Sequence, residues 1–172
     1  MKQLITYSFL LFTFLASAQV KNIFDIARKG NLQEIQEIYK NNPTSIDSVD
    51  EKKSSPLLLA CYRGNTDVAL FLADKTKNIN YNSGMGTALM ATVMSGNATI
   101  VEKLIAVKAD LNLADTSGKT ALIYATFFNK INIAKLLLQA GADKNAKDVD
   151  NRTALDYANF NKNTELIILL NK

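Results

Sequence analysis

The residues that could carry out covalent or acid–base chemistry are few in this chain. Its 172 residues include no His and a single Cys. Without His there is no imidazole base, no His metal ligand and no His-based pH switch. One Cys cannot form an intramolecular disulfide, a Cys-x-x-Cys redox pair or a thiolate zinc site. The composition therefore predicts no catalytic residue, no metal site and no cofactor.

The single Cys, Cys61, follows the small residue Ala60 in an apolar run. A nucleophilic thiol needs a neighbouring group that lowers its pKa, and nothing close in the sequence supplies one. We expect Cys61 to be a small buried hydrophobic side chain.

Gly84-Met85-Gly86 resembles a glycine-rich phosphate loop only superficially. No strand precedes it and no Lys follows it, as a phosphate-binding loop requires. We expect these residues to form the tip of a shortened hairpin.

The positions of these residues follow from a repeat in the sequence. Four similar segments start 32, 33 and 33 residues apart, which is the spacing of a repeat architecture. They are Ser55–Ala60, Thr87–Thr92, Thr120–Ala125 and Thr153–Ala158. A divergent earlier copy runs from Asn22 to Asp47.

Each copy contains the signals of two short helices. The Ser or Thr that opens each of the four segments is suited to a helix N-cap. Gly64 and Gly96, nine residues after the first two starts, are suited to ending the first helix. The second helix carries a larger set of apolar side chains, and stacked copies must share one core because a single copy cannot bury its own. Candidate core residues include Leu32, Leu57, Leu89, Leu122 and Leu155.

These segments resemble the ankyrin repeat, whose signature is T-P-L-H-x-A at a 33-residue period. Ala140-Gly141-Ala142-Asp143-Lys144-Asn145 also resembles the family's G-A-D-x-N segment. The resemblance implies an all-α ankyrin repeat solenoid of about five stacked helix-turn-helix units joined by short hairpin-like loops. The resemblance covers about Lys21 to Lys172 and predicts an ankyrin repeat domain over residues 19–172, with repeats at approximately 21–54, 55–86, 87–119, 120–152 and 153–172.

The chain departs from the family pattern at the signature His, which ties the loop to the helix. Leu58, Met90, Ile123 and Asp156 stand there instead. We therefore expect that polar tie to be absent and these repeats to be less stable than consensus ones.

Asp50, Asp115 and Asp148 could be imagined as catalytic carboxylates. Their spacing of one per repeat indicates instead a tight turn, in which a short acidic side chain accepts bonds from nearby backbone N–H groups.

The resemblance implies a concave binding face lined by the first helices and the hairpin tips. The eighth position of each repeat reads Arg28, Tyr62, Met94, Phe127 and Phe160. The next position reads Lys29, Arg63, Ser95, Phe128 and Asn161. So many large apolar groups in one column favour a partner-binding stripe, although aromatic rings could instead fold onto neighbouring repeats.

The predicted partner-binding residues are Arg28, Tyr62, Arg63, Met94, Phe127, Phe128 and Phe160. The cations at the N-terminal end of this stripe should prefer an acidic rim on the partner. The hairpin tips, including Lys52 and Arg152, should add adaptable polar contacts.

Residues 1–18 have the layout of a secretory signal peptide. A positive start is followed by an apolar run from Leu4 to Leu15 and by Ala16-Ser17-Ala18, which predicts cleavage before Gln19. The apolar run is shorter than the ~20 residues that span a bilayer as a helix. The alternative is an uncleaved N-terminal anchor.

The sequence predicts a non-catalytic protein-interaction module, exported to the periplasm or secreted, that scaffolds, protects or inhibits another exported protein. A bacterial source fits this pattern. The net charge of +4 is spread along the chain, unlike the basic stripe of a nucleic-acid binder, and no small-molecule substrate is expected. The alternatives are a membrane-surface protein held by an uncleaved signal and an enzyme with an unrecognised site.

The last predicted helix contains five consecutive apolar residues, Leu166 to Leu170. Because they cover every side of a helix, some should remain exposed. They indicate either a slightly apolar end of the solenoid or self-association through this C-terminal helix.

Overall fold

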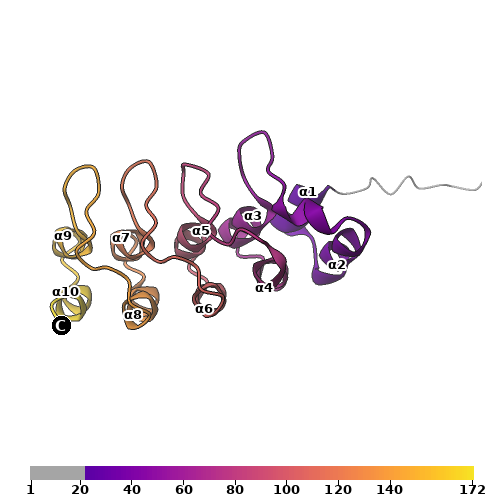
Figure 1. Cartoon of the computed structure of the whole chain (residues 1–172). Helices are drawn as coiled ribbons and strands as arrows, with labels where there is room; N and C mark the ends of the chain where they lie inside the picture. Colours follow the sequence, from indigo (N-terminus) through magenta and orange to yellow (C-terminus); the bar gives the residue numbers. More distant parts are fainter. Residues whose placement is uncertain (1–21) are drawn as a thin grey trace, which may run out of the picture.

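The computed structural model describes residues 22–172, which form ten α-helices, one 3-10 helix and no strand. Consecutive helices form five pairs stacked side by side (Figure 1). An inner row comprises α1 (Ile23–Lys29), α3 (Pro56–Arg63), α5 (Ala88–Ser95), α7 (Ala121–Phe127) and α9 (Ala154–Phe160). An outer row comprises α2 (Leu32–Asn41), α4 (Thr66–Lys75), α6 (Ala98–Ala106), α8 (Ile131–Gln139) and α10 (Thr164–Leu170). The all-α solenoid predicted from the repeats is confirmed.

Each inner helix packs on the next inner helix, and hairpin-like loops extend from this row to one side of the molecule (Figure 1). In the first pair, a 3-10 helix, η1 (Pro43–Asp47), follows α2 before the first hairpin. The loop around Gly84 to Gly86 is a tight turn, as predicted, and an isolated bridge between Asn82 and Thr87 closes it.

The predicted N-caps are confirmed in four inner helices. The side-chain oxygens of Ser55, Thr87, Thr120 and Thr153 each accept the backbone N–H three residues later. Such a cap satisfies a helix-end donor that otherwise has no partner and contributes typically about 1 kcal/mol. The recurring Ser/Thr is therefore the physical reason that each inner helix starts where it does.

The inner helices α3, α5, α7 and α9 end in a left-handed residue whether or not that residue is Gly, whereas α1 ends at Gly30 with φ of -85°. Gly64 and Gly96 have φ of 66° and 78°. At the matching positions, Asn129 and Lys162 have φ of 55° and 53°. Because side chains carry a steric penalty in this region, the last two turns are held by their surroundings rather than by glycine freedom.

One core runs through all five pairs. Leu57, Leu89 and Leu122 are buried, and Cys61 lies among them without exposure. Leu32 was expected in this core, but it opens α2 on the surface and is exposed. Ile35, one turn later on the inward side of that helix, is the buried residue instead.

Polar side chains also connect neighbouring repeats. Side-chain oxygens of Asp47, Asn80 and Asn112 accept backbone N–H groups about 30 residues later. The donors are Lys77, Asp110 and Asp143, at 3.0, 2.8 and 2.8 Å. Each such bond fixes the register of one repeat on the next.

The expectation that the polar tie between loop and helix is absent is wrong for two repeats. The Tyr124 hydroxyl of α7 donates to Asp115 Oδ2, and the Tyr157 hydroxyl of α9 donates to Asp148 Oδ2. In both cases the tyrosine lies one residue after the position of the missing His. A longer side chain from the neighbouring position therefore makes the connection.

Within residues 22–172, no helix is long and apolar enough to cross a membrane. The signal peptide predicted for residues 1–18 lies outside the described residues.

Candidate protein-binding groove

The hairpin acids organise turns, as their spacing predicts. Asp148 Oδ1 accepts the backbone N–H groups of Asp150 and Arg152, each at 3.0 Å. Asp115 makes the same pair of bonds with Ser117 and Lys119. Asp50 does so with Lys52 and Ser54. These carboxylates therefore stabilise the hairpins by accepting backbone hydrogen bonds.

Asp148 is the most enclosed of these acids, with a fully buried side chain 3.5 Å from the Lys119 ammonium. Burial by itself raises the pKa of this carboxyl. The hydrogen bonds from the Tyr157 hydroxyl and from two backbone N–H groups, together with the Lys119 charge, outweigh burial and lower the pKa of Asp148. Asp148 is therefore a structural anion.

Cys61 is buried in α3, and burial raises the pKa of its thiol to about 12. A buried thiol that stays neutral is a poor nucleophile near neutral pH. The expected buried hydrophobic role of Cys61 agrees with this environment. Among residues 22–172, no group of three or more His, Cys, Asp or Glu side chains is placed to hold a metal ion.

The four large residues of the predicted column all project from the inner row and remain accessible. The exposed fractions of Tyr62, Met94, Phe127 and Phe160 are 51, 40, 43 and 82%. Exposed large apolar groups on neighbouring elements are typical of an interaction surface. The structure divides these four between two pockets.

The first pocket contains Tyr62 and Met94 and lies between the hairpins and helices of the second and third repeats. We call it the thioether pocket, because three methionines line it: Met85, Met90 and Met94. Leu58, Leu59 and Ala91 complete its apolar wall, with Lys52, Ser54 and Ser83 among the hairpin residues. Its volume is about 340 Å³.

The second pocket contains Phe127 and Phe160 and lies between the fourth and fifth repeats. We call it the aromatic pocket; Tyr157, Asn151, Arg152 and Asp156 also line it. Its volume is about 550 Å³. Phe127 packs edge-on against Tyr157, with ring centroids 5.5 Å apart, whereas Phe160 projects into solvent.

Phe128 lies beside Phe127 but contributes more to packing. Its ring stacks on Tyr124, with centroids 6.0 Å apart, and meets Phe127 edge-on at 4.9 Å. The column therefore contains both exposed side chains, as a binding stripe requires, and rings that pack onto their neighbours. Phe127 and Phe128 fold partly onto their neighbours, and Tyr62 and Phe160 stand outward.

The predicted cations have different surroundings. Arg28 pairs with Asp50 at 3.0 Å and with Asp25 at 3.6 Å, so much of its charge is balanced locally. The Arg63 guanidinium lies over the Tyr62 ring, 5.9 Å from its centroid. Lys52 lines the thioether pocket and makes no ion pair with any residue of the described part. We call the surface between the hairpins and the inner helices, where both pockets lie, the groove. Its positive charge comes from Arg63 and Lys52 more than from Arg28.

The column pattern missed Met85 and Met90, which join the same pocket. Met85 is 86% exposed at a hairpin tip, and the buried Met90 lines the same pocket from α5. The concentration of Met residues between positions 85 and 94 is a signal for this pocket that lies in the sequence. The eighth position of each repeat does not by itself identify this pocket. Met85 comes from a hairpin, and Met90 comes from an earlier turn of the helix that carries Met94.

Comparisons with known proteins agree with the architecture. The family model described as "Ankyrin repeats (3 copies)" matches residues 23–115 and 89–172. The chain is 30% identical over 101 residues to ankyrin repeat domain-containing protein SAT10 of Stachybotrys chartarum. It is 31% identical over 110 residues to ankyrin repeat and SAM domain-containing protein 6 of Rattus norvegicus. It is 28% identical over 117 residues to inactive serine/threonine-protein kinase TEX14 of Mus musculus.

These alignments cover 59, 63 and 67% of this chain but only 5, 12 and 8% of the respective relatives. The similarity therefore concerns the repeats, and none of the three names indicates an enzymatic activity for this chain. Ankyrin repeats indicate a protein-interaction module. With the family model matched from residue 23 to residue 172 and the helix pairs in place, the chain belongs to the ankyrin-repeat family.

Proposed function

We propose that this protein is an exported ankyrin module that binds another exported protein through the groove between its hairpins and inner helices. The observation that carries the proposal is the set of four large apolar side chains exposed along the inner row. These are Tyr62, Met94, Phe127 and Phe160. Aromatic residues and Met are enriched at protein interfaces. Two further exposed residues lie with these four: Met85 lines the thioether pocket, and Phe128 packs against Phe127.

Export is supported by the first 18 residues. Their short positive start, apolar run and Ala16-Ser17-Ala18 match the requirements of a signal peptidase substrate. The bacterial periplasm or the medium is the proposed destination. There the protein scaffolds, protects or inhibits its partner without catalysing a reaction. Neither a nucleic acid nor a small-molecule substrate has a part in this proposal.

A membrane-surface protein is the second candidate, favoured by the apolar run from Leu4 to Leu15. In that case the N-terminal segment stays attached and holds the repeats at a bilayer. Intact mass of native material separates the two candidates. Loss of Met1 to Ala18 supports the exported form, whereas a retained segment in a fraction that requires detergent supports the anchored form.

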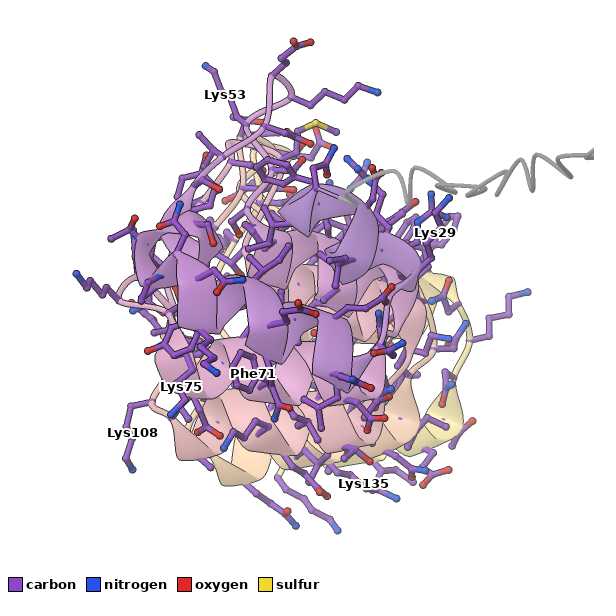
Figure 2. The ribbon with its side chains drawn as sticks, turned by 90° about the vertical axis from the view of Figure 1, so that its right-hand side faces the viewer. Lys29, Lys53, Phe71, Lys75, Lys108 and Lys135 are labelled. Carbon is purple, nitrogen blue, oxygen red and sulfur yellow. The ribbon has the colours of Figure 1, made fainter. Side chains whose placement is uncertain are left out.

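Lysine-directed crosslinking of the native complex tests the groove. Lys53 lies at the hairpin end of the molecule, whereas Lys135 lies at the opposite end, and Lys29 and Lys75 lie on opposite sides (Figure 2). Lys52 and Lys53, in the hairpin beside the groove, should carry most crosslinks to the partner. Crosslinks concentrated instead on Lys75, Lys108 and Lys135 would place the interface elsewhere and refute the proposed surface.

A further inference from the structure

The thioether pocket and the aromatic pocket each lie between hairpin residues and inner-helix residues. The thioether pocket lies between the second and third repeats, and the aromatic pocket lies between the fourth and fifth. The two pockets are therefore two repeats apart along the inner row of helices, whose order Figure 1 shows. Neighbouring packed helices lie about 10 Å apart, so the pocket centres are separated by roughly 20 Å.

This separation suits an extended polypeptide. A strand-like chain advances about 3.3 Å per residue, so a 20 Å distance corresponds to about six residues. Hairpin residues form one wall of each pocket and inner-helix residues form the other. A single chain lying along this groove can therefore place one side chain in each pocket.

The chemistry of the two pockets differs. Around the thioether pocket, apolar side chains of Leu58, Met90 and Met94 make a flexible lining that accepts a large aliphatic or aromatic group. Lys52 and Arg63 lie at this end, and neither makes an ion pair with a described residue. The aromatic pocket has Arg152 and Asp156 together, so it offers no comparable excess of positive charge.

We propose that the partner is recognised through an extended segment with two large apolar residues about six positions apart. The first residue occupies the thioether pocket and is flanked by Asp or Glu, whose carboxylates lie near Lys52 and Arg63. The second occupies the aromatic pocket against Phe160. This inference rests on the proposed function, because it specifies what the same groove binds.

A displayed library of random peptides of about 14 residues tests the inference, since that length spans both pockets at the extended rise. The full chain, as purified, is the bait. Enriched peptides should share two large apolar positions separated by five to seven residues. Acidic residues should gather beside one of the two positions, and binding should weaken with salt.

Variants of exposed groove residues then assign the positions. The double variant Met85→Ser/Met94→Ser should weaken the enriched peptides at least about tenfold, as should Phe160→Ser. Ile168→Ser, which removes an exposed apolar group from the outer helix α10, is the matched control and should leave affinity unchanged. Thermal unfolding of each variant establishes that it remains folded.

Three outcomes overturn the extended segment: no enrichment, enrichment without a paired spacing, or binding that is insensitive to both groove variants. None of these refutes the proposed groove, because a native partner could still crosslink beside Lys52 and Lys53. If crosslinks to the native partner also avoid the groove, the proposed function fails as well. The two failures are thus separately observable.

Discussion

Tyr157 and Asp148 join the last inner helix to the hairpin that precedes it. The Tyr157 hydroxyl donates to Asp148 Oδ2 at 2.5 Å, while Asp148 Oδ1 accepts two backbone N–H groups of the hairpin. Tyr124 and Asp115 repeat the arrangement one unit earlier. The hairpins that wall the groove are therefore fixed to the helices that carry Phe127 and Phe160.

Removing the Asp148 carboxylate should destabilise the C-terminal repeats. Asp148→Ala leaves the buried Tyr157 hydroxyl and the hairpin N–H groups without an acceptor, which should cost about 2–3 kcal/mol in the free energy of unfolding. Urea unfolding measures this change. Asp150→Ala, in the same hairpin but exposed, is the control and should change stability little. Equal losses for the two variants would contradict the role of Asp148.

Stability should also fall in acid. Because the folded protein lowers the pKa of Asp148 below that of the unfolded chain, its contribution is present above about pH 4 and is lost as the pH falls through the lower folded value. Urea midpoints measured from pH 7 downward should show a smaller acid loss for Asp148→Asn than for the unmodified protein. Parallel curves would show that Asp148 does not contribute to this loss.

Core substitutions should have unequal effects along the solenoid. Leu122→Ala, with neighbouring repeats on both sides, should cost on the order of 2–5 kcal/mol. Ile35→Ala removes an equally buried side chain in the first described pair and should cost less, because within residues 22–172 that pair has a neighbouring pair on one side. Denaturant melts of the two variants give the comparison, and the reverse order would contradict nearest-neighbour stacking.

The C-terminal helix should not drive dimerisation by itself. Leu166 and Leu170 are buried, and Ile168, with 55% of its surface accessible, is the large apolar residue of α10 that remains exposed. A stable interface needs about 800 Å² from each partner, so we expect a monomer at micromolar concentration. Light scattering would detect a dimer, and its loss in Ile168→Ser would instead establish self-association through α10.

The fold could be predicted because its signals are local and recur. The Ser or Thr caps, the repeated Leu and the glycines at Gly64 and Gly96 each specify backbone geometry within a few residues. Repetition at one period then determines which helices are neighbours. Leu32 shows the limit of this reasoning: in a divergent copy, one turn of helix separates an exposed Leu from the buried Ile35.

The groove could be predicted only in part, because its chemistry depends on contacts between distant residues. A column of positions identifies Tyr62 and Phe160, whose exposure follows from their place on one helix face. It cannot show that Arg28 is paired with Asp50, 22 residues later in the chain. Nor can it show that Met85 from a hairpin and Met90 from a helix enclose one pocket.

The most direct test of the groove is the affinity of the native partner for Tyr62→Ser/Phe160→Ser. Both side chains are more than half exposed, so the variant should unfold at nearly the same temperature as the unmodified protein. A loss of at least about 30-fold in affinity, equivalent to about 2 kcal/mol, is predicted for interface hot spots. Full affinity in the folded variant would contradict the account.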